Sequence, residues 1–413
     1  MAQIAQSAVA PRVGTFTALR QANFRLYFFG QMVSMSGTWM QQVAQGYLVY
    51  QLTQSELWLG IVACAAGIPM LLIAPFAGVF VERMPRRRLL IMTGTVQMCL
   101  AFILSALVFS DAVQIWHIVT LALLLGTTNA FDAPARQTII SDLVSREMLI
   151  SGIAMNSMII NGARVFGPAV AGVFLVRFGP AWCFLLNGLS FLAVIGTLFL
   201  LQLDRKPLVS GKARPLEQLR EGLSYARHNP IVRSLLLLAT VGGFFGWAVI
   251  ALFPAFADEV LRSPESGYAL INTALGVGSV IGGVMSASLG AKLGRGRYIV
   301  LMMTASSIAA LLFSLTRSVP AAVFMCLFAG YALISYFVSL NMTLQTNIAP
   351  EFRGRIMSLY TLCIIGFNPF GALVLGLMAE ETGTPFALAL FAVAFGLLCG
   401  LVLVKSPELR RVR

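Results

Sequence analysis

The chain has 413 residues, of which 58% are hydrophobic and 11% are charged, and its mean hydropathy is +0.84. Because soluble domains carry about 25% charged residues, this composition excludes a water-soluble core and with it a soluble enzyme. The formal net charge of +13 would suggest a nucleic-acid partner in a soluble protein. Here the charges are confined to turns between apolar segments, which argues against that partner.

Apolar segments long enough to cross about 30 Å of hydrocarbon as helices recur along the whole chain. Only helices satisfy their own backbone hydrogen bonds in lipid, so we predict an all-α membrane protein with twelve transmembrane helices. The predicted spans are residues 24–50, 56–80, 89–109, 115–141, 149–176, 181–203, 232–256, 268–290, 298–316, 320–348, 355–379 and 384–404.

One long polar segment divides these spans into six and six. Residues 204–231 include a stretch with helical periodicity, Leu216–Arg227, which predicts an amphipathic cytoplasmic linker. The predicted organisation is an N-terminal half over residues 1–203, the linker, and a C-terminal half over residues 232–413.

The basic turns indicate both duplication and orientation. The turn at residues 82–88 recurs 209 positions later at residues 291–297, which indicates two pseudo-symmetric halves. If both termini lie in the cytoplasm, 24 of the 29 lysines and arginines lie on that side. This asymmetry agrees with the positive-inside rule and predicts a multi-pass protein with both termini cytoplasmic.

The sequence lacks the motifs of energy-coupling and catalytic sites. No Walker loop, metal-ligand cluster or nucleophile motif is present, and the six cysteines show neither metal nor redox spacing. We therefore predict that the chain is not an enzyme and needs neither a cofactor nor a metal.

Residues 78–87, which read Gly-Val-Phe-Val-Glu-Arg-Met-Pro-Arg-Arg, resemble the signature of the major facilitator superfamily between its second and third helices. That signature reads Gly-x-x-x-Asp-Arg-x-Gly-Arg-Arg/Lys. Glu82 and Pro85 depart from it, but they keep a carboxylate and a turn-forming residue. The stretch from Phe131 to Gln137 and the stretch from Ala163 to Pro168 resemble the bacterial efflux branch that contains the enterobactin exporter.

The turn after the second helix is interpreted as a conformational latch between the halves. Gly78 would allow a neighbouring helix to pass closely, and Glu82 would face the start of the eleventh helix near Gly354, where the helix dipole favours a carboxylate. The alternative is that these arginines only set the topology. The predicted latch comprises Gly78, Glu82, Arg83, Arg86, Arg87, Lys292 and Arg295.

Asp132 is the one carboxylate that we place inside a membrane helix, and an ionisable group there is a functional candidate. Arg136 follows one turn later on the same face. Arg164, in the fifth helix, is predicted to lie about 8 Å along the membrane normal from Asp132. Asp132 either takes up and releases a proton under the influence of an arginine or forms a permanent ion pair between the fourth and fifth helices.

The fifth helix carries small residues at helical spacing, which permit close helix contact. Gly167, Pro168 and Gly172 resemble the motif typical of exporters in the superfamily, and the eighth helix offers small positions such as Gly276 and Gly283. We predict a tight contact between the halves on the outer side, with ordinary membrane packing as the alternative.

In this superfamily helices one, four, seven and ten line a central cavity, so polar and aromatic residues on these helices are cavity candidates. A polar stripe is equally compatible with contacts between helices. The candidates are Ser34, Thr38, Gln41, Gln45, Phe131, Trp247, Tyr331, Ser335 and Tyr336.

Together these features predict a proton-coupled exporter of the bacterial inner membrane that works by alternating access as a monomer. Its cargo would be a siderophore or another amphiphilic small molecule or drug, bulky and either neutral or anionic. Two alternatives remain at this stage, a lipid or lysolipid flippase on the same fold and a non-transporting membrane sensor.

Overall fold

The computed structural model describes residues 16–201, 215–406 and 408, and this part of the chain forms helices and no strand. The N-terminal half contains six long helices. They are α1 (Ala22–Thr53), α2 (Glu56–Arg83), α3 (Arg86–Phe109), α4 (Ile115–Leu143), α5 (Leu149–Phe178) and α6 (Pro180–Leu200). Helix α7 (Pro215–His228) follows the undescribed start of the predicted linker.

Two membrane segments of the C-terminal half are interrupted by π-helical turns. The first is α8 (Pro230–Val241), the π-turn Gly242–Trp247, a 3-10 turn (Ala248–Leu252) and α9 (Phe253–Glu259). The other comprises α13 (Arg353–Thr361), the π-turn Leu362–Gly366 and α14 (Asn368–Thr382). The uninterrupted helices are α10 (Ser266–Leu293), α11 (Arg295–Leu315), α12 (Val319–Asn347) and α15 (Thr384–Lys405).

The predicted all-α membrane fold is confirmed. The described residues contain 11 helical segments that are long and apolar enough to cross a membrane. Helix α1 falls outside this group although its 32 residues are long enough, because polar residues such as Gln31 and Gln41 interrupt its apolar surface. The spans predicted from the sequence agree with the helices to within a few residues.

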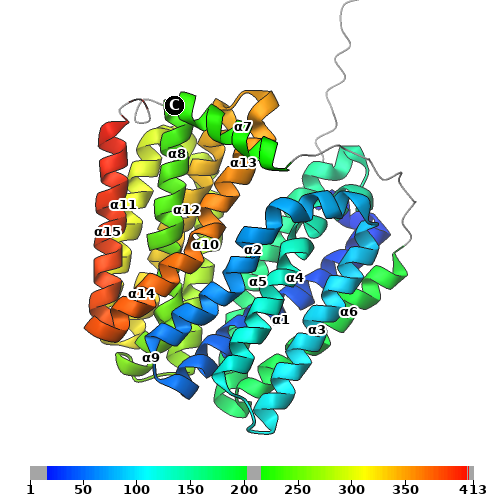
Figure 1. Cartoon of the computed structure of the whole chain (residues 1–413), viewed down its shortest axis with the longest axis vertical. Helices are drawn as coiled ribbons and strands as arrows, with labels where there is room; N and C mark the ends of the chain where they lie inside the picture. Colours follow the sequence, from blue (N-terminus) through cyan, green and yellow to red (C-terminus); the bar gives the residue numbers. More distant parts are fainter. Residues whose placement is uncertain (1–15, 202–214, 407, 409–413) are drawn as a thin grey trace, which may run out of the picture.

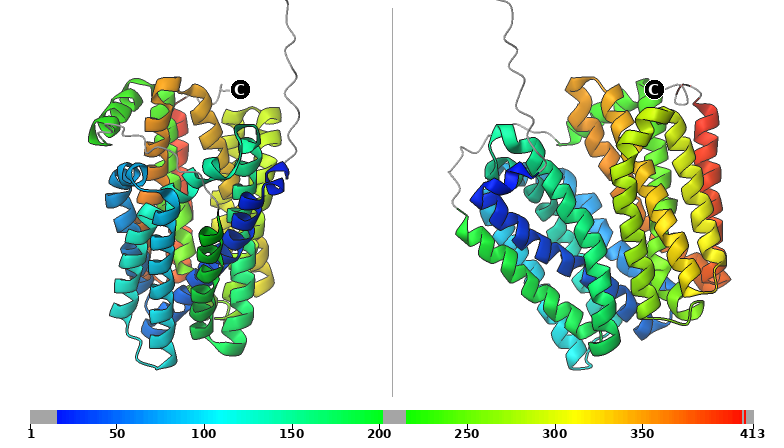
Figure 2. Two further views of the ribbon diagram at one scale, coloured as in Figure 1. Left: turned by 90° about the vertical axis from the view of Figure 1, so that its right-hand side faces the viewer. Right: turned by 180° about the vertical axis from the view of Figure 1, so that it is seen from behind.

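The two halves meet at one end of the molecule. Helix α7 and the end of α15 lie at the opposite end, which we call the linker end (Figure 1). The ribbons of the halves approach one another at the far end and diverge toward the linker end (Figure 2).

Glycines allow two helix pairs, α2 with α14 and α5 with α10, to close the far end. A β-carbon at Gly60 would lie 2.7 Å from the carbonyl oxygen of Ala372, and one at Gly376 would lie 2.5 Å from that of Glu56. On the other side, a β-carbon at Gly172 would lie 2.6 Å from that of Ala269, and midway along α5 one at Gly276 would lie 2.6 Å from the carbonyl oxygen of Arg164. Backbones this close gain dispersion contacts, which are a main source of helix association in lipid.

Candidate functional site

Asp132 lies in the interior of α4 and is buried, with 4% of its surface exposed. It forms an ion pair with Arg136, four residues later in the same helix. The Thr93 hydroxyl of α3 donates a hydrogen bond of 2.7 Å to its Oδ1. Both carboxylate oxygens are thus engaged, one by a cation and one by a neutral donor, which is the arrangement that a buried charge requires.

A polar network extends from this pair along α3 and α4. Arg136 donates to Oε1 of Gln97 at 3.3 Å, and Nε2 of Gln97 donates to Oδ1 of Asn129 at 2.9 Å. The Tyr27 hydroxyl of α1 is buried and has no hydrogen-bond partner in the described part of the chain. The charged pair is therefore surrounded by groups that can accept or donate a proton or bind a water molecule.

Arg164 does not lie beside Asp132, so the predicted meeting of helices four and five through these residues is wrong. The prediction rested on height along the membrane normal and left out the direction in which each side chain points. Helix α4 packs mainly against α2 and α3, and Asp132 faces α3. Arg164 instead lies over two indole rings, with its Cζ atom 5.1 Å from the ring centroid of Trp39 and 5.3 Å from that of Trp247.

Four of the cavity candidates are buried by neighbouring helices, which corrects their assignment. Gln41 accepts a hydrogen bond of 2.6 Å from Asn187 of α6, and Ser335 donates one of 3.2 Å to Gly282 of α10. Tyr336 donates to the carbonyl of Leu238 at 2.8 Å. These three residues connect helices within one half. The fourth is Ser34, which is fully buried and has no hydrogen-bond partner among the described residues.

The other five candidates are only partly buried, and their assignment to a cavity stays a prediction. Thr38 donates to the carbonyl of Ser34 at 3.0 Å, and Trp247 contacts both Arg164 and Phe337. The partly buried candidates are Thr38, Gln45, Phe131, Trp247 and Tyr331.

The predicted latch divides into residues that are described and residues that are not. The side chains of Gly78, Glu82 and Arg83 lie outside the described part of the structure. Lys292 is exposed, and Arg87 donates to the carbonyl of Phe199 in its own half at 2.8 Å.

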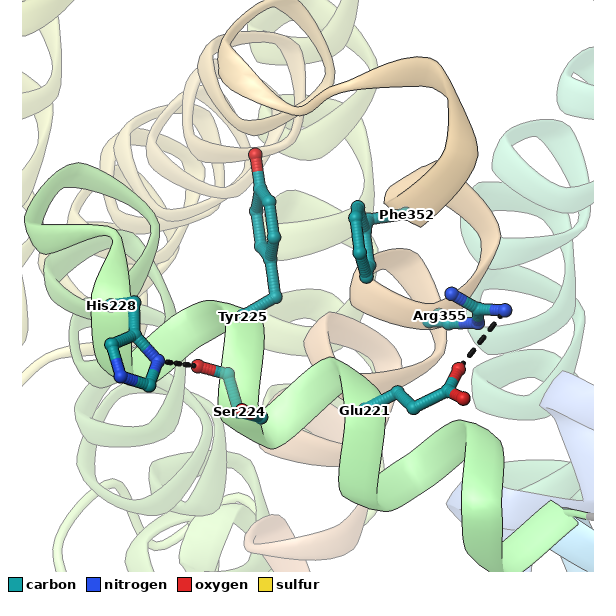
Figure 3. A pocket seen from close by; sticks show the side chains of 6 residues that line it. All are labelled: Glu221, Ser224, Tyr225, His228, Phe352 and Arg355. Carbon is teal, nitrogen blue, oxygen red and sulfur yellow. Dashed lines mark hydrogen bonds and ion pairs between the residues drawn. The ribbon is translucent and has the colours of Figure 1, made fainter.

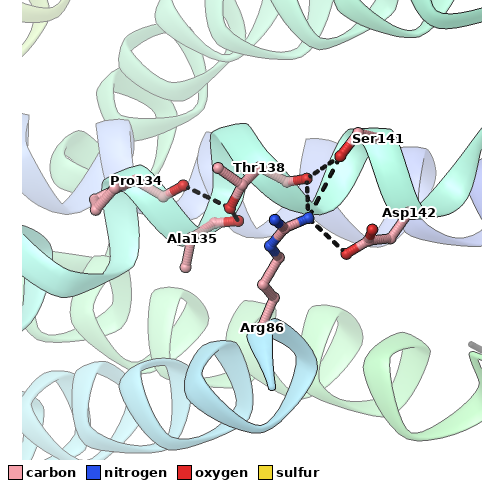
Figure 4. A network of polar contacts seen from close by, with 6 residues as sticks. All are labelled: Arg86, Pro134, Ala135, Thr138, Ser141 and Asp142. Atoms are coloured by element: carbon pink, nitrogen blue, oxygen red, sulfur yellow. Dashed lines mark hydrogen bonds and ion pairs between the residues drawn. The ribbon is translucent and has the colours of Figure 1, made fainter. Parts of the chain in front are cut away.

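Arg86 and Arg295 make equivalent contacts, each with the next membrane helix of its own half. Arg86, the first residue of α3, pairs with Asp142 at 2.9 Å and donates to the carbonyl of Thr138 at 3.1 Å near the end of α4 (Figure 4). Arg295, the first residue of α11 and 209 positions later, donates to the hydroxyl of Thr346 near the end of α12 at 3.0 Å. In this structure these arginines connect the third helix of each half to the fourth, and a contact of either residue between the halves stays a prediction.

Replacing Arg86 with glutamine is expected to lower the free energy of unfolding by no more than about 1 kcal/mol. The reason is that the side chains of Arg86 and Asp142 are 36% and 17% exposed, so water and salt screen the pair. Reversible unfolding in mixed micelles measures the change, and the loss should shrink further in high salt. A loss above about 3 kcal/mol would instead indicate a buried, structurally essential ion pair.

The helix-five motif contacts both halves. Gly167 leaves no room for a β-carbon between α5 and α1, where Trp39 and the carbonyl of Ser36 adjoin it. Gly172 faces the other half, and a β-carbon there would lie 2.6 Å from that of Ala269 in α10. Pro168 is buried inside α5. The motif thus fixes the distance from α5 to α1 on one side and to α10 on the other.

Helix α7 is fastened to the start of the eleventh membrane segment around a cavity of about 500 Å³ (Figure 3). Arg355 forms an ion pair of 3.0 Å with Glu221, and the ring of Tyr225 stacks on Phe352 with centroids 4.4 Å apart. The sequence predicted the amphipathic helix but not this partner, because hydrophobic periodicity shows that a helix has an apolar face without showing what covers it.

The sequence reasoning also missed a set of contacts between carboxylates and hydroxyls that joins the halves at the far end. Each carboxylate lies at or near the end of a helix and so resembles an ordinary solvated charge in the sequence. The contacts are Tyr47 with Glu265 at 3.0 Å, Tyr50 with Glu259 at 2.5 Å, Ser55 with Glu380 at 2.7 Å and Thr384 with Glu56 at 3.0 Å. Together with the glycine contacts they hold the far end closed.

Over nearly its whole length the chain is similar to known transporters. The family described as transmembrane secretion effector matches residues 13–413. The staphyloferrin A transporter of Staphylococcus aureus is 24% identical over 87% of this chain and 90% of that protein. The multidrug efflux pump Tap of Mycolicibacterium fortuitum is 22% identical over 96% of this chain and 98% of that protein. Macrolide efflux protein A of Streptococcus pyogenes is 23% identical, with coverages of 87% and 91%.

Solved structures show the same fold at lower sequence identity. The nucleoside transporter NupG has a TM-score of 0.76 at 13% identity and covers 93% of this chain and 99% of its own. A bacterial homologue of the human lysosomal transporter Spinster, in an inward-facing and unoccupied conformation, has a TM-score of 0.65 at 16% identity, with coverages of 95% and 96%.

Proposed function

Because the chain belongs to the transmembrane secretion effector family of the major facilitator superfamily, we propose that it exports amphiphilic small molecules from the bacterial cytoplasm in exchange for protons. Relatives whose names specify a siderophore, macrolides and multiple drugs support a cargo of this class. The protein would act as a monomer in the inner membrane.

The observation that carries this proposal is that the two halves are in contact at the far end and diverge toward the linker end. Glycine contacts between α2 and α14 and between α5 and α10 seal one end, while the ribbons separate toward the other (Figure 2). The placement of basic residues supports a cytoplasmic linker end. The conformation would then admit cargo from the cytoplasm, and rocking of the halves would release it outside.

Asp132 is the candidate proton carrier. Among the described residues only Asp132 and Glu56 are buried carboxylates, and Asp132 alone lies in the interior of a helix. Movement of one charge across about 100 mV supplies roughly 2.3 kcal/mol. This energy supports a cargo gradient of about fiftyfold.

The test is cargo-dependent proton release from acidified everted vesicles, followed with an internal pH dye and challenged with siderophores, anionic drugs and lipophilic cations. Wild type is expected to show alkalinisation on addition of cargo, and Asp132→Asn at equal expression is expected to lose it. Asp111→Asn, a change of the same chemistry at an exposed position in the loop after α3, is the matched control and should behave as wild type.

Each contrary result has its own meaning. Alkalinisation that survives in Asp132→Asn would leave export in place and remove Asp132 as the carrier. Transport of cargo by purified protein in liposomes without proton movement would contradict proton coupling. Movement of lipid alone would indicate a flippase, and no movement of any compound would indicate a sensor.

A further inference from the structure

Among the described residues, Arg164 has no anionic partner. It lies halfway along α5, and its Nε atom is buried without a hydrogen-bond partner. No described residue forms an ion pair or hydrogen bond with its guanidinium, whereas Arg136 in the interior of α4 is paired with Asp132. Guanidinium groups in such surroundings ordinarily have a carboxylate or several acceptors around them.

The position of Arg164 is set by both halves of the protein. Trp39 comes from α1 of the N-terminal half, and Trp247 ends the π-helical turn of the C-terminal half. Phe337 holds the Trp247 indole edge-to-face at 6.3 Å. π-Helical turns inside α-helices often accompany functional sites, because the extra residue redirects the side chains that follow.

The backbone beside Arg164 is equally constrained. Gly276 of α10 packs against its carbonyl oxygen, and Gly167, less than one turn later on α5, packs against the backbone of α1 next to Trp39. The guanidinium is therefore held in place by packing and not by a counter-ion. Arg164 is partly buried, and contact with aromatic faces offsets only part of the desolvation of such a cation.

We propose that Arg164, Trp39 and Trp247 form the binding site for the anionic group of the exported molecule, and that this group is a carboxylate or phenolate on a planar aromatic ring. The inference rests on the proposed export function, because it assigns the cargo of that function. Because no described residue uses its N–H groups, the guanidinium beside the two indoles can donate two parallel hydrogen bonds to such an anion. The indoles can also stack on a flat ring attached to the anion.

This arrangement selects cargo by charge and links it to conformation. A neutral analogue leaves the cation unpaired, and a cationic analogue is repelled by it, so both bind more weakly. Since one indole comes from each half, a ligand bound here contacts both halves, and its presence or absence alters how the halves pack.

The test is direct binding to the purified full-length protein in detergent, measured by calorimetry with 1-naphthoate, its neutral analogue 1-naphthamide and the cation 1-naphthylmethylamine. Wild type is expected to bind the carboxylate at least about tenfold more tightly than the amide. Arg164→Gln should weaken binding of the carboxylate by about 10- to 100-fold and leave binding of the amide nearly unchanged. Arg177→Gln, an exposed arginine near the end of the same helix, should behave as wild type.

Two further variants distinguish an effect on ligand binding from an effect on the folded structure. Arg164→Lys keeps the charge but loses the planar fork, so it should weaken carboxylate binding by about 3- to 10-fold. If Arg164→Gln fails to fold, Arg164→Lys provides the test. Trp247→Phe retains a ring with a weaker attraction for cations and should weaken carboxylate binding by about 2- to 5-fold. The melting temperature of unliganded Arg164→Gln should be no lower than that of wild type, because no ion pair is lost.

Equal binding of the carboxylate and the amide by wild type, or unchanged carboxylate binding in both Arg164 variants, would overturn this inference. So would a fall in the melting temperature of Arg164→Gln with equal losses for all three ligands, which would make Arg164 structural. The vesicle experiment separates this failure from that of the function. If binding depends on Arg164 but no proton-linked export is seen, the export function is rejected and the binding site is retained. If export is seen but does not depend on Arg164, the binding site is rejected and the export function is retained.

Discussion

Replacing Arg136 with glutamine is expected to lower the free energy of unfolding by about 3–5 kcal/mol. The replacement leaves Asp132 buried in the interior of α4, with the Thr93 hydroxyl as its remaining partner among the described residues. A buried carboxylate without a cation loses its hydration and gains too little in return. Reversible unfolding in mixed micelles at fixed pH and ionic strength measures the loss.

The double variant Asp132→Asn with Arg136→Gln should recover much of this stability, because two neutral amides can bond to one another and to Gln97. The expected coupling energy between the two positions is at least about 2 kcal/mol. The pair Arg86 and Asp142 at the linker end is the control, and its exposure predicts a coupling below about 1 kcal/mol. Similar couplings for the two pairs would contradict the burial argument.

Comparison of the single variants with the double variant also decides how a loss of transport in Asp132→Asn is interpreted. The single replacement removes the candidate proton carrier and leaves Arg136 without its counter-ion. The double variant removes both charges, so the protein is stabilised without a carrier. If the double variant folds well but moves no protons, the loss follows from the missing charged pair and not from a damaged fold.

The sequence predicted the segments of this protein far better than the directions of its side chains. Helix positions follow from the length of apolar runs, which depends only on neighbouring residues in the chain. The relation of Asp132 to Arg164 depends on how α4 and α5 are rotated about their axes. In strongly apolar helices such as α5, the polar residues are too few to define that rotation from composition.

Side-chain direction also limited the prediction for the polar residues of α1. Ser34 and Gln41 share a helical face, which the sequence shows, but a polar face in a membrane protein either lines a cavity or bonds to another helix. The hydrogen bond from Asn187 to Gln41 settles this for one residue. The close approach of α5 to α10 was easier to predict, because small residues at helical spacing on both helices have few other uses.

Replacing Gly276 with valine is expected to reduce cargo transport by at least about tenfold. Even the β-carbon would lie 2.6 Å from the carbonyl oxygen of Arg164, and a backbone atom in the opposite helix cannot rotate away. Overpacking of this kind costs about 1–3 kcal/mol. Since the cost falls on the conformation in which α5 and α10 pack together, it shifts the balance between conformations by about 5- to 150-fold. Transport into liposomes is the measurement.

Gly283, on the same helix, provides the matched control. Its nearest neighbour to an added β-carbon is Cγ2 of Ile334 at 3.9 Å, an ordinary contact distance. Gly283→Val should therefore transport at close to the wild-type rate. Hydrogen exchange should accelerate at the far-end halves of α5 and α10 in Gly276→Val and stay unchanged in Gly283→Val. Equal behaviour of the two variants would show that the α5–α10 contact does not govern the cycle.

The contact between Gly276 and Arg164 also links closure of the far end to recognition of cargo. The carbonyl oxygen of Arg164 touches α10, while its guanidinium contacts an indole from each half. Separation of α5 from α10 therefore moves the backbone that carries the guanidinium relative to Trp247. Gly276→Val should consequently weaken 1-naphthoate binding together with transport, whereas Arg164→Gln should weaken that binding without accelerating exchange in α10. If Gly276→Val alters transport and leaves naphthoate affinity unchanged, closure and recognition are independent properties of this interface.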